Sequence, residues 1–241
     1  MSETGSKPVW VIIPAAGVGK RMKSDTPKQY LKINHKTIIE HTLKRFIKHP
    51  KVSGVIVALS SEDEYWNDLK IDHTDKPLYT VEGGEERSDT VMNALEYLLV
   101  VEKLPEDSWV MVHDAARPCV SDEDINALLV IRESDCVGGI LATPVRDTMK
   151  RSQPDSLQIA KTEDRDNLWH ALTPQMFRLG ELNQALQHCL DKFISISDES
   201  SAMEAIGKTP LIVEGSGNNV KITHPEDLQL ASWLLTKEGN L

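Results

Sequence analysis

The feature that most constrains the fold of this chain is a regular alternation between short, continuously apolar segments and longer amphipathic ones. Strands buried on both faces of a parallel sheet are apolar throughout, and the helices between them carry one apolar stripe. The alternation therefore predicts an α/β fold, with a Rossmann-like, mostly parallel sheet and helices on both of its faces. Strands are expected at residues 9–13, 55–59, 78–81, 109–112, 139–145 and 211–214.

Helices are predicted between these strands by apolar residues at helical spacing and by capping residues. Thr37 and Glu40 have the spacing of a capping box directly before such a stretch. Ser121 precedes three acidic residues, which favour the positive end of a helix dipole. Further helices are expected at residues 88–101, 181–190 and 199–206 and from Pro225.

One segment, residues 146–168, departs from the alternation. It is polar, contains Pro154 and shows only a weak alternation of apolar residues. We therefore expect it to leave the core as a protruding β-arm, while residues 1–241 otherwise form a single domain.

Charge and cysteine content exclude several classes of protein. The formal net charge of −10 over 241 residues argues against a binder of nucleic acid polymers, which normally carries a basic excess. Cys119, Cys136 and Cys189 are far apart and form no paired motif, so neither a disulfide framework nor a zinc site is expected. The polar N-terminus predicts no secretory signal, and no apolar run approaches the roughly 20 residues that span a bilayer. A cytoplasmic protein with no membrane association is expected.

A turn of small residues, Pro14-Ala-Ala-Gly-Val-Gly-Lys-Arg21, follows the first predicted strand. Glycines at the carboxyl end of such a strand let backbone N–H groups approach phosphate oxygens. The turn fits neither a P-loop nor a dinucleotide fingerprint, and a purely structural turn is the alternative. Six basic residues between Lys20 and Lys36 favour the phosphate site, where we expect them to converge; a solvated helix face is the alternative.

Two further loops are expected at the same sheet edge. Gly83 and Gly84 begin a turn before a helix, where backbone groups and the Thr90 hydroxyl are candidates to contact a base or phosphate. The alternative, a tight turn with an N-cap, is an adequate structural explanation of the two glycines. His113, Asp114 and Arg117 follow a buried strand. A carboxylate there is well placed to hold Mg²⁺ beside substrate phosphates, while a structural Asp114–Arg117 ion pair is the alternative or an additional role.

Seven motifs occur in order along nearly the whole chain. They are Pro14-Ala-Ala-Gly-x-Gly-x-Arg21, Pro27-Lys-Gln-Tyr30, Gly83-Gly-x-x-Arg87, His113-Asp-Ala-Ala-Arg-Pro118, Pro144-Val-Arg-Asp-Thr-Met-Lys150, Leu168-Trp-His-Ala-Leu-Thr-Pro-Gln175 and Asn219-Val-Lys-Ile-Thr223. Together they resemble the 2-C-methyl-D-erythritol 4-phosphate cytidylyltransferase family, whose fold is of the nucleotidyltransferase type. The resemblance implies transfer of CMP from CTP to the phosphate of a sugar alcohol in non-mevalonate isoprenoid biosynthesis.

The resemblance also implies roles for individual residues. Arg21, Lys28 and Lys221 correspond to catalytic residues of the family, and Asp114 to its Mg²⁺ ligand. The resemblance places CTP against Pro14, Ala15, Ala16, Gly17, Gly19, Lys28, Gly84, Glu85, Thr90, Asp114 and Ala115. It places the acceptor against Arg117, Thr148, Arg165, Thr173 and Lys221. Thr148 and Arg165 would reach a partner's site through the arm of a homodimer, although a surface salt bridge is the simpler explanation of Arg165.

The chain departs from the family pattern at Asn218, where many members carry a carboxylate that can join the metal. The nearest alternative function is a ribitol- or glycerol-type phosphate cytidylyltransferase, against which the motifs at residues 148–150 and 169–171 count. A nucleotide-cofactor oxidoreductase would need a third glycine near Met22 and an acidic end to the second strand, and the sequence has neither. A weakened binding protein is opposed by the basic residues, and the histidines lack metal-ligand spacing.

Overall fold

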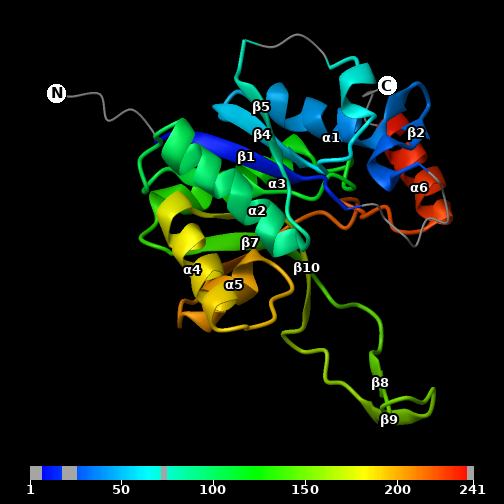
Figure 1. Ribbon diagram of the computed structural model, residues 1–241. Coiled ribbons are helices and arrows are strands. Elements are labelled where there is room, and N and C mark those ends of the chain that lie inside the picture. The colour runs from blue at the N-terminus through cyan, green and yellow to red at the C-terminus, as the bar shows by residue number, and fades with distance from the viewer. Residues whose placement is uncertain (1–6, 18–25, 72–74, 238–241) are drawn as a thin grey trace.

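The computed structural model describes residues 7–17, 26–71 and 75–237 and contains a central seven-stranded sheet (Figure 1). From edge to edge its strands are β11 (Leu211–Glu214), β7 (Gly138–Pro144), β10 (Trp169–Arg178), β6 (Trp109–Val112), β1 (Val9–Pro14), β4 (Gly54–Leu59) and β5 (Leu78–Glu82). The pairs β1–β4, β1–β6, β4–β5 and β7–β11 are parallel, so the predicted mostly parallel α/β sheet is confirmed.

The exception is β10, which runs antiparallel to both β6 and β7 and was not predicted. Its sequence contains Pro174, and proline normally counts against a strand in the middle of a sheet. The pairing of β10 with β7 shifts register between Ala171 and Gln175, so Pro174 lies in an irregularity where no ladder hydrogen bond is needed. This irregularity also carries Thr173 to the end of β6.

Helices cover both faces of the sheet, because successive side chains of its buried strands point to opposite sides. The helices are α1 (Ile38–Ile47), α2 (Arg87–Glu96), α3 (Asp122–Val130), α4 (Leu179–Asp191), α5 (Glu199–Ala205) and α6 (Pro225–Lys237). Val9, Val11 and Ile13 of β1 pack in one apolar core with α1 and α3. Trp10 and Ile12 pack in a second core with α2, α4 and α5, which Figure 1 shows on the opposite face.

Capping explains where several of these helices begin. At α1 the Thr37 amide donates to Glu40 Oε2 (2.6 Å) and the Glu40 amide donates to Thr37 Oγ1 (3.3 Å), so the predicted capping box is confirmed. Ser121 Oγ accepts the amide of Asp124 at the start of α3. The predicted helix at residues 88–101 is shorter than expected, because α2 gives way to a π-helical turn at Tyr97–Val101.

Smaller elements extend this core. A two-stranded ribbon, β2 (Lys32–Ile33) with β3 (Lys36–Thr37), precedes α1 and shares a third apolar core with α6. Its strands are too short for any alternation, so they were not predicted. Short 3-10 turns lie at Lys28–Tyr30, Trp66–Asp68 and Ile131–Glu133. None of the helices in the described part of the chain is long and apolar enough to cross a membrane.

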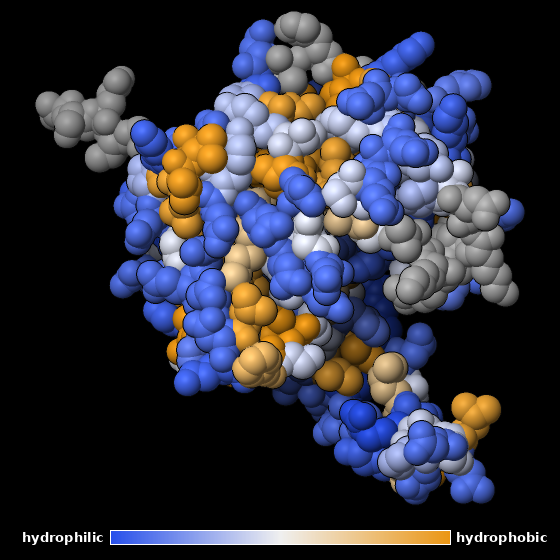
Figure 2. All heavy atoms as spheres, viewed as in Figure 1, coloured by the Kyte–Doolittle hydropathy of each residue, from blue (hydrophilic) through white to orange (hydrophobic). Residues whose placement is uncertain are grey.

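The predicted protruding arm contains the hairpin β8 (Lys150–Ser152) with β9 (Ile159–Thr162), which extends away from the sheet in Figure 1. Its surface is largely hydrophilic (Figure 2). Large apolar side chains are nevertheless exposed along it, namely Met149, Leu157, Ile159 and Leu168. A two-stranded hairpin is only marginally stable alone, so these side chains make the arm a candidate for contact with another molecule.

The order of the strands decides where a ligand can bind. From β1 the chain builds β4 and β5 on one side, and it then returns to place β6 on the other side of β1. Such a reversal leaves a crevice at the carboxyl ends of the two neighbouring strands. The loops that follow β1, β5 and β6 therefore meet at one edge of the sheet.

Candidate functional site

A cavity of about 190 Å³ lies at this edge and collects residues from segments that are far apart in the sequence. Its lining comprises Pro14 at the end of β1, Ala15, Ala16 and Gly17 after it, Lys28 and Gln29, Gly84, Glu85, Glu86, Arg87 and Thr90 after β5, Asp114, Ala115 and Ala116 after β6, and Lys221. Every described residue that was predicted to contact CTP is in this set. Gly19 and Arg21, also predicted here, lie outside the described residues.

The loop after β1 is fixed by hydrogen bonds to the backbone of Ala15 and leaves open space beside Gly17. The Ala15 amide donates to the Ala58 carbonyl (2.8 Å), and Gln29 Nε2 donates to the Ala15 carbonyl (2.7 Å). A Cβ at Gly17 would meet no atom of the described residues within 4 Å. The backbone here is thus fixed at its start and accessible, as an anion-binding turn requires.

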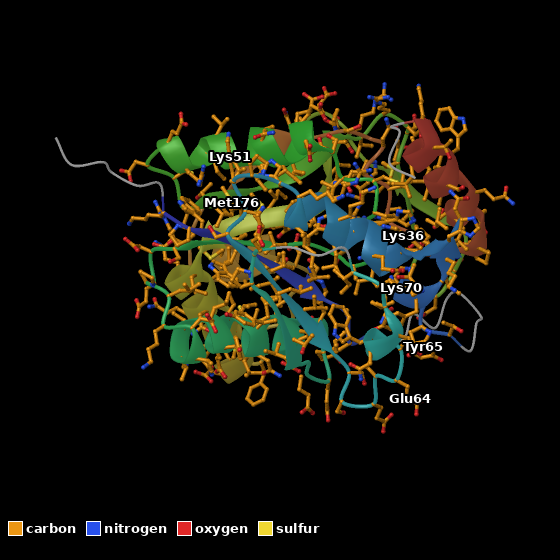
Figure 3. The ribbon with its side chains drawn as sticks, turned by 90° about the horizontal axis from the view of Figure 1, so that it is seen from above. Lys36, Lys51, Glu64, Tyr65, Lys70 and Met176 are labelled. Atoms are coloured by element: carbon orange, nitrogen blue, oxygen red, sulfur yellow. The ribbon has the colours of Figure 1, made fainter. Side chains whose placement is uncertain are left out.

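Lys28 is brought to the cavity by the 3-10 turn at Lys28–Tyr30. The expectation that the whole basic stretch converges on one site is wrong for Lys32 and Lys36. These two lysines belong to the β2–β3 ribbon that follows the turn, and they line a separate groove with Tyr65 and Lys70. Figure 3 labels Lys36, Tyr65 and Lys70 of this groove. The ribbon reverses the chain, so closeness in sequence does not place these charges together.

The glycines after β5 are required by close packing. A Cβ at Gly83 would lie 2.6 Å from Ala16 Cβ, and one at Gly84 would lie 2.3 Å from Asp89 Cβ. Thr90 Oγ1 accepts the Gly84 amide (3.1 Å) and donates to the Glu86 carbonyl (2.9 Å). The structural explanation of this loop therefore holds, and the same packing brings Gly84 to the cavity wall.

Asp114 is the centre of a cluster of positive charges. Lys221 Nζ lies 2.8 Å and Arg117 Nε 3.3 Å from Asp114 Oδ2, while Arg87 Nε lies 3.4 Å from Oδ1. Burial alone would raise the pKa of Asp114, but the charges of these cations outweigh it and hold the pKa below its usual range. Asp114 is therefore ionised, and the Asp114–Arg117 pair that the sequence left open is formed.

Arg87 and Glu199 were missed by the sequence analysis. Glu199, at the start of α5, is 1% exposed and binds Arg87 through two hydrogen bonds, Nη1 to Oε1 (2.6 Å) and Nη2 to Oε2 (3.2 Å). Burial alone would lower the pKa of Arg87, but Glu199 and Asp114 raise it. Because both ends of the guanidinium are engaged by Glu199, Arg87 presents only its Nε to Asp114. The motif contained Arg87, but nothing in the sequence linked it to Glu199.

His113 is fully buried and supports the end of β6. Its Nε2 lies 3.0 Å from the Arg117 carbonyl and its Nδ1 3.1 Å from Thr173 Oγ1. Burial lowers the pKa of His113 to about 4, so the ring is neutral. A carbonyl only accepts, so Nε2 carries the proton and Nδ1 accepts from the Thr173 hydroxyl, whose oxygen in turn accepts the Asp114 amide (3.1 Å).

The residues predicted to contact the acceptor fall into two groups. Thr173, Arg117 and Lys221 lie around Asp114, although Arg117 and Thr173 are buried behind it and do not line the cavity. Thr148 and Arg165 belong to the arm, and neither lines the cavity of its own chain. Arg165 Nη1 donates to the carbonyl of Arg146 within the arm. One chain alone therefore leaves these two residues away from the other predicted contacts.

Comparison with known proteins adds an independent finding. The family model IspD, 2-C-methyl-D-erythritol 4-phosphate cytidylyltransferase, matches residues 9–237. A protein of that name from Alteromonas mediterranea is 52% identical over 231 residues, 95% of this chain and 94% of its own. One from Vibrio parahaemolyticus is 50% identical over 239 residues, 99% of each chain. The crystal structure of the Francisella tularensis protein superimposes with a TM-score of 0.80 at 41% identity, covering 95% of this chain and 100% of that one.

Proposed function

Because the chain belongs to the 2-C-methyl-D-erythritol 4-phosphate cytidylyltransferase family, we propose that it transfers CMP from CTP to 2-C-methyl-D-erythritol 4-phosphate. The products are pyrophosphate and 4-diphosphocytidyl-2-C-methyl-D-erythritol, an intermediate of non-mevalonate isoprenoid biosynthesis. The observation that carries the proposal is the cavity itself, in which an accessible glycine turn, two lysines and an ionised aspartate converge at the switch point of the sheet.

In this reaction an oxygen of the acceptor phosphate forms a bond to the α-phosphorus of CTP. The bond from that phosphorus to the bridging oxygen breaks, and pyrophosphate leaves with the electron pair. The attacking phosphate is already anionic at neutral pH, so no protein side chain has to remove a proton. The work of the protein is to align two anions and to neutralise the charge that accumulates between them.

The cations of the cavity suit this task. We assign stabilisation of the α-phosphate to Lys28 and Arg21, and contact with both the α-phosphate and the incoming phosphate to Lys221. Lys28 and Lys221 line the same cavity from two loops that are far apart in the sequence, which supports this division. Gly17 and Gly19 would hold the triphosphate, while Gly84, Glu85 and Thr90 would contact cytosine and ribose and Ala115 would line the ribose.

We propose Mg²⁺ as the cofactor and Asp114 as the protein group that holds it. Among the described residues no three His, Cys, Asp or Glu side chains gather around one point. The donor set therefore fits an ion that takes one carboxylate and obtains its remaining ligands from phosphates and water, as Mg²⁺ does. The low pKa of Asp114 keeps that carboxylate ionised, as a metal ligand has to be. The ion would offset negative charge on the triphosphate.

We further propose that the protein acts as a homodimer. In this arrangement the arm of one subunit brings Thr148 and Arg165 to the acceptor phosphate in the partner's site, beside Arg117 and Thr173 of that site. Two observations support it: the arm exposes apolar side chains, and neither Thr148 nor Arg165 lines the cavity of its own chain. No membrane and no nucleic acid polymer takes part.

Mixing inactive subunits tests whether the site is shared. If it is, each site takes Lys221 from one subunit and Arg165 from the other. In a mixed dimer of Arg165→Ala and Lys221→Ala subunits, one of the two sites then contains both wild-type residues. We expect each variant alone to be nearly inactive and the exchanged mixture to recover up to about a quarter of wild-type activity, by random pairing into dimers. Activity is measured as pyrophosphate release after subunit exchange. Recovery no greater than that of either variant alone would show that each subunit completes its own site.

A reducing compartment, the cytoplasm, is the proposed location. Cys119, Cys136 and Cys189 are far apart in the sequence and form no paired motif. Sparse, unpatterned cysteines are typical of proteins of the reducing cytosol.

The acceptor requirement tests the function directly. Pyrophosphate release is measured from CTP and Mg²⁺ with methylerythritol phosphate, with ribitol 5-phosphate, or with no acceptor. We expect rapid release with methylerythritol phosphate alone. Release only with ribitol 5-phosphate would reassign the substrate, and equal release without any acceptor would indicate a CTP-hydrolysing enzyme.

A further inference from the structure

Lys221 lies in a segment that has no regular secondary structure. Residues 215–224, between β11 and α6, contain neither helix nor strand. A backbone in a helix or sheet is held by its own ladder of hydrogen bonds, and this segment lacks one. The place of Lys221 therefore depends on individual contacts that other parts of the chain make with its neighbours.

Those contacts fall on both sides of Lys221. Two residues before it, Asn219 is 1% exposed, and its side-chain Nδ2 donates to the Thr173 carbonyl (2.7 Å). The Asn219 carbonyl accepts Arg117 Nη1 (2.7 Å). One residue after Lys221, the Ile222 amide donates to the Ala116 carbonyl (2.9 Å). The segment is thus joined to the end of β6 and to the irregular part of β10.

We propose that Asn219 is a positioning residue for Lys221, which it places by tying the segment to β10 through the Thr173 carbonyl. The inference rests on the proposed function, because it concerns the cation that approaches both phosphates. Lys221 Nζ lies 2.8 Å from Asp114 Oδ2, so its ammonium is aimed into the cluster only while its backbone stays in place. A displacement of about 1 Å at a catalytic group can cost about 100-fold in rate.

The chemistry of the contact explains why an amide is needed at this position. A backbone carbonyl only accepts, so its side-chain partner has to donate, which an aspartate of the same shape cannot do at neutral pH. The other amide atom, Asn219 Oδ1, is buried and has no hydrogen-bond partner in the described part of the chain. Burying a polar atom without a partner costs folding free energy, so Oδ1 does not favour asparagine at this position. The group that favours it is the donor Nδ2.

The test compares two asparagines whose side-chain amides each donate to a backbone carbonyl. Asn219→Ala is expected to lower kcat by about 10- to 100-fold while KM for CTP changes by less than about threefold, because the loss falls on alignment for the reaction. Asn126→Ala is the control: Asn126 Nδ2 donates to the Asp122 carbonyl in α3, away from the cavity lining, and this variant should stay within about twofold of wild type. Asn219→Asp should be as impaired as Asn219→Ala. Wild-type kcat in either Asn219 variant would overturn the proposal.

A double-mutant cycle separates positioning from a general structural effect. If Asn219 acts through Lys221, then adding Asn219→Ala to a Lys221→Ala protein should lower the residual kcat by less than about threefold. Independent losses that multiply would overturn the proposal. Thermal unfolding identifies any variant that does not fold, in which case Asn219→Ser takes its place in the cycle. A wild-type protein that releases no pyrophosphate with any acceptor would instead contradict the proposed function.

Discussion

Replacing Asp114 with asparagine is expected to lower kcat by at least about 10³-fold, the largest single effect in this protein. The substitution keeps the shape of the side chain and removes its charge. Three cations then face one another without the carboxylate that separates them, at distances of 2.8 to 3.4 Å from its former oxygens. The proposed Mg²⁺ also loses its only protein carboxylate. Both effects act on the charge balance around the triphosphate.

The same variant should lose about 1–3 kcal/mol of folding stability, because its buried partners lose a charged hydrogen-bond acceptor. Urea unfolding measures this loss, and pyrophosphate release measures kcat over a range of Mg²⁺ concentrations. Asp191→Asn, an exposed position at the end of α4, is the matched control and should leave both quantities unchanged. An Asp114→Asn protein within about tenfold of wild-type kcat would remove this carboxylate from the mechanism.

Replacing Lys28 with alanine is expected to lower kcat by about 10²- to 10³-fold with little change in stability. A preorganised cation near the reacting phosphate acts where water is excluded, and loss of one such group in other enzymes has a cost of this size. Lys28 is only partly buried, so its removal leaves no large void in either core of the sheet. The effect should appear in kcat more than in KM for CTP.

Lys32→Ala provides the control for Lys28. The two lysines are four residues apart, but Lys32 is exposed and lines the other groove. We expect Lys32→Ala to retain wild-type kcat. Equal losses in both variants would show that Lys32 also acts on the substrate, which would contradict its assignment to the separate groove. Wild-type kcat in Lys28→Ala would remove Lys28 from the reaction.

Much of the fold follows from local sequence patterns, because a strand buried on both faces can only be apolar. The six predicted strands of the sheet all occur, and the Thr37–Glu40 capping box begins α1 as expected. The strand β10 could not be predicted, since its Pro174 disfavours a central strand and only the register shift beside it accommodates the ring. Strand propensity is a property of a single residue type, whereas the register shift in β10 arises only when the strands of the sheet pair.

The site residues likewise differ in whether a local pattern predicts them. Residues that follow directly from strand ends, such as Gly84 and Asp114, were predicted because the fold fixes where strand ends meet. The pair of Arg87 with Glu199 joins positions 112 residues apart, and no local pattern reports such a contact. The sequence also does not predict in which direction a side chain points after a turn. For that reason Lys32 and Lys36 were expected at the cavity but lie elsewhere.

The measurement that tests the central claim most directly is a competition for limiting CTP. Equal concentrations of methylerythritol phosphate and ribitol 5-phosphate are mixed with the protein and Mg²⁺, and the cytidylylated products are separated by mass. We predict 4-diphosphocytidyl-2-C-methyl-D-erythritol as almost the only product, with one pyrophosphate released for each molecule formed. A predominance of CDP-ribitol, or pyrophosphate release without either product, would contradict the assignment of this site.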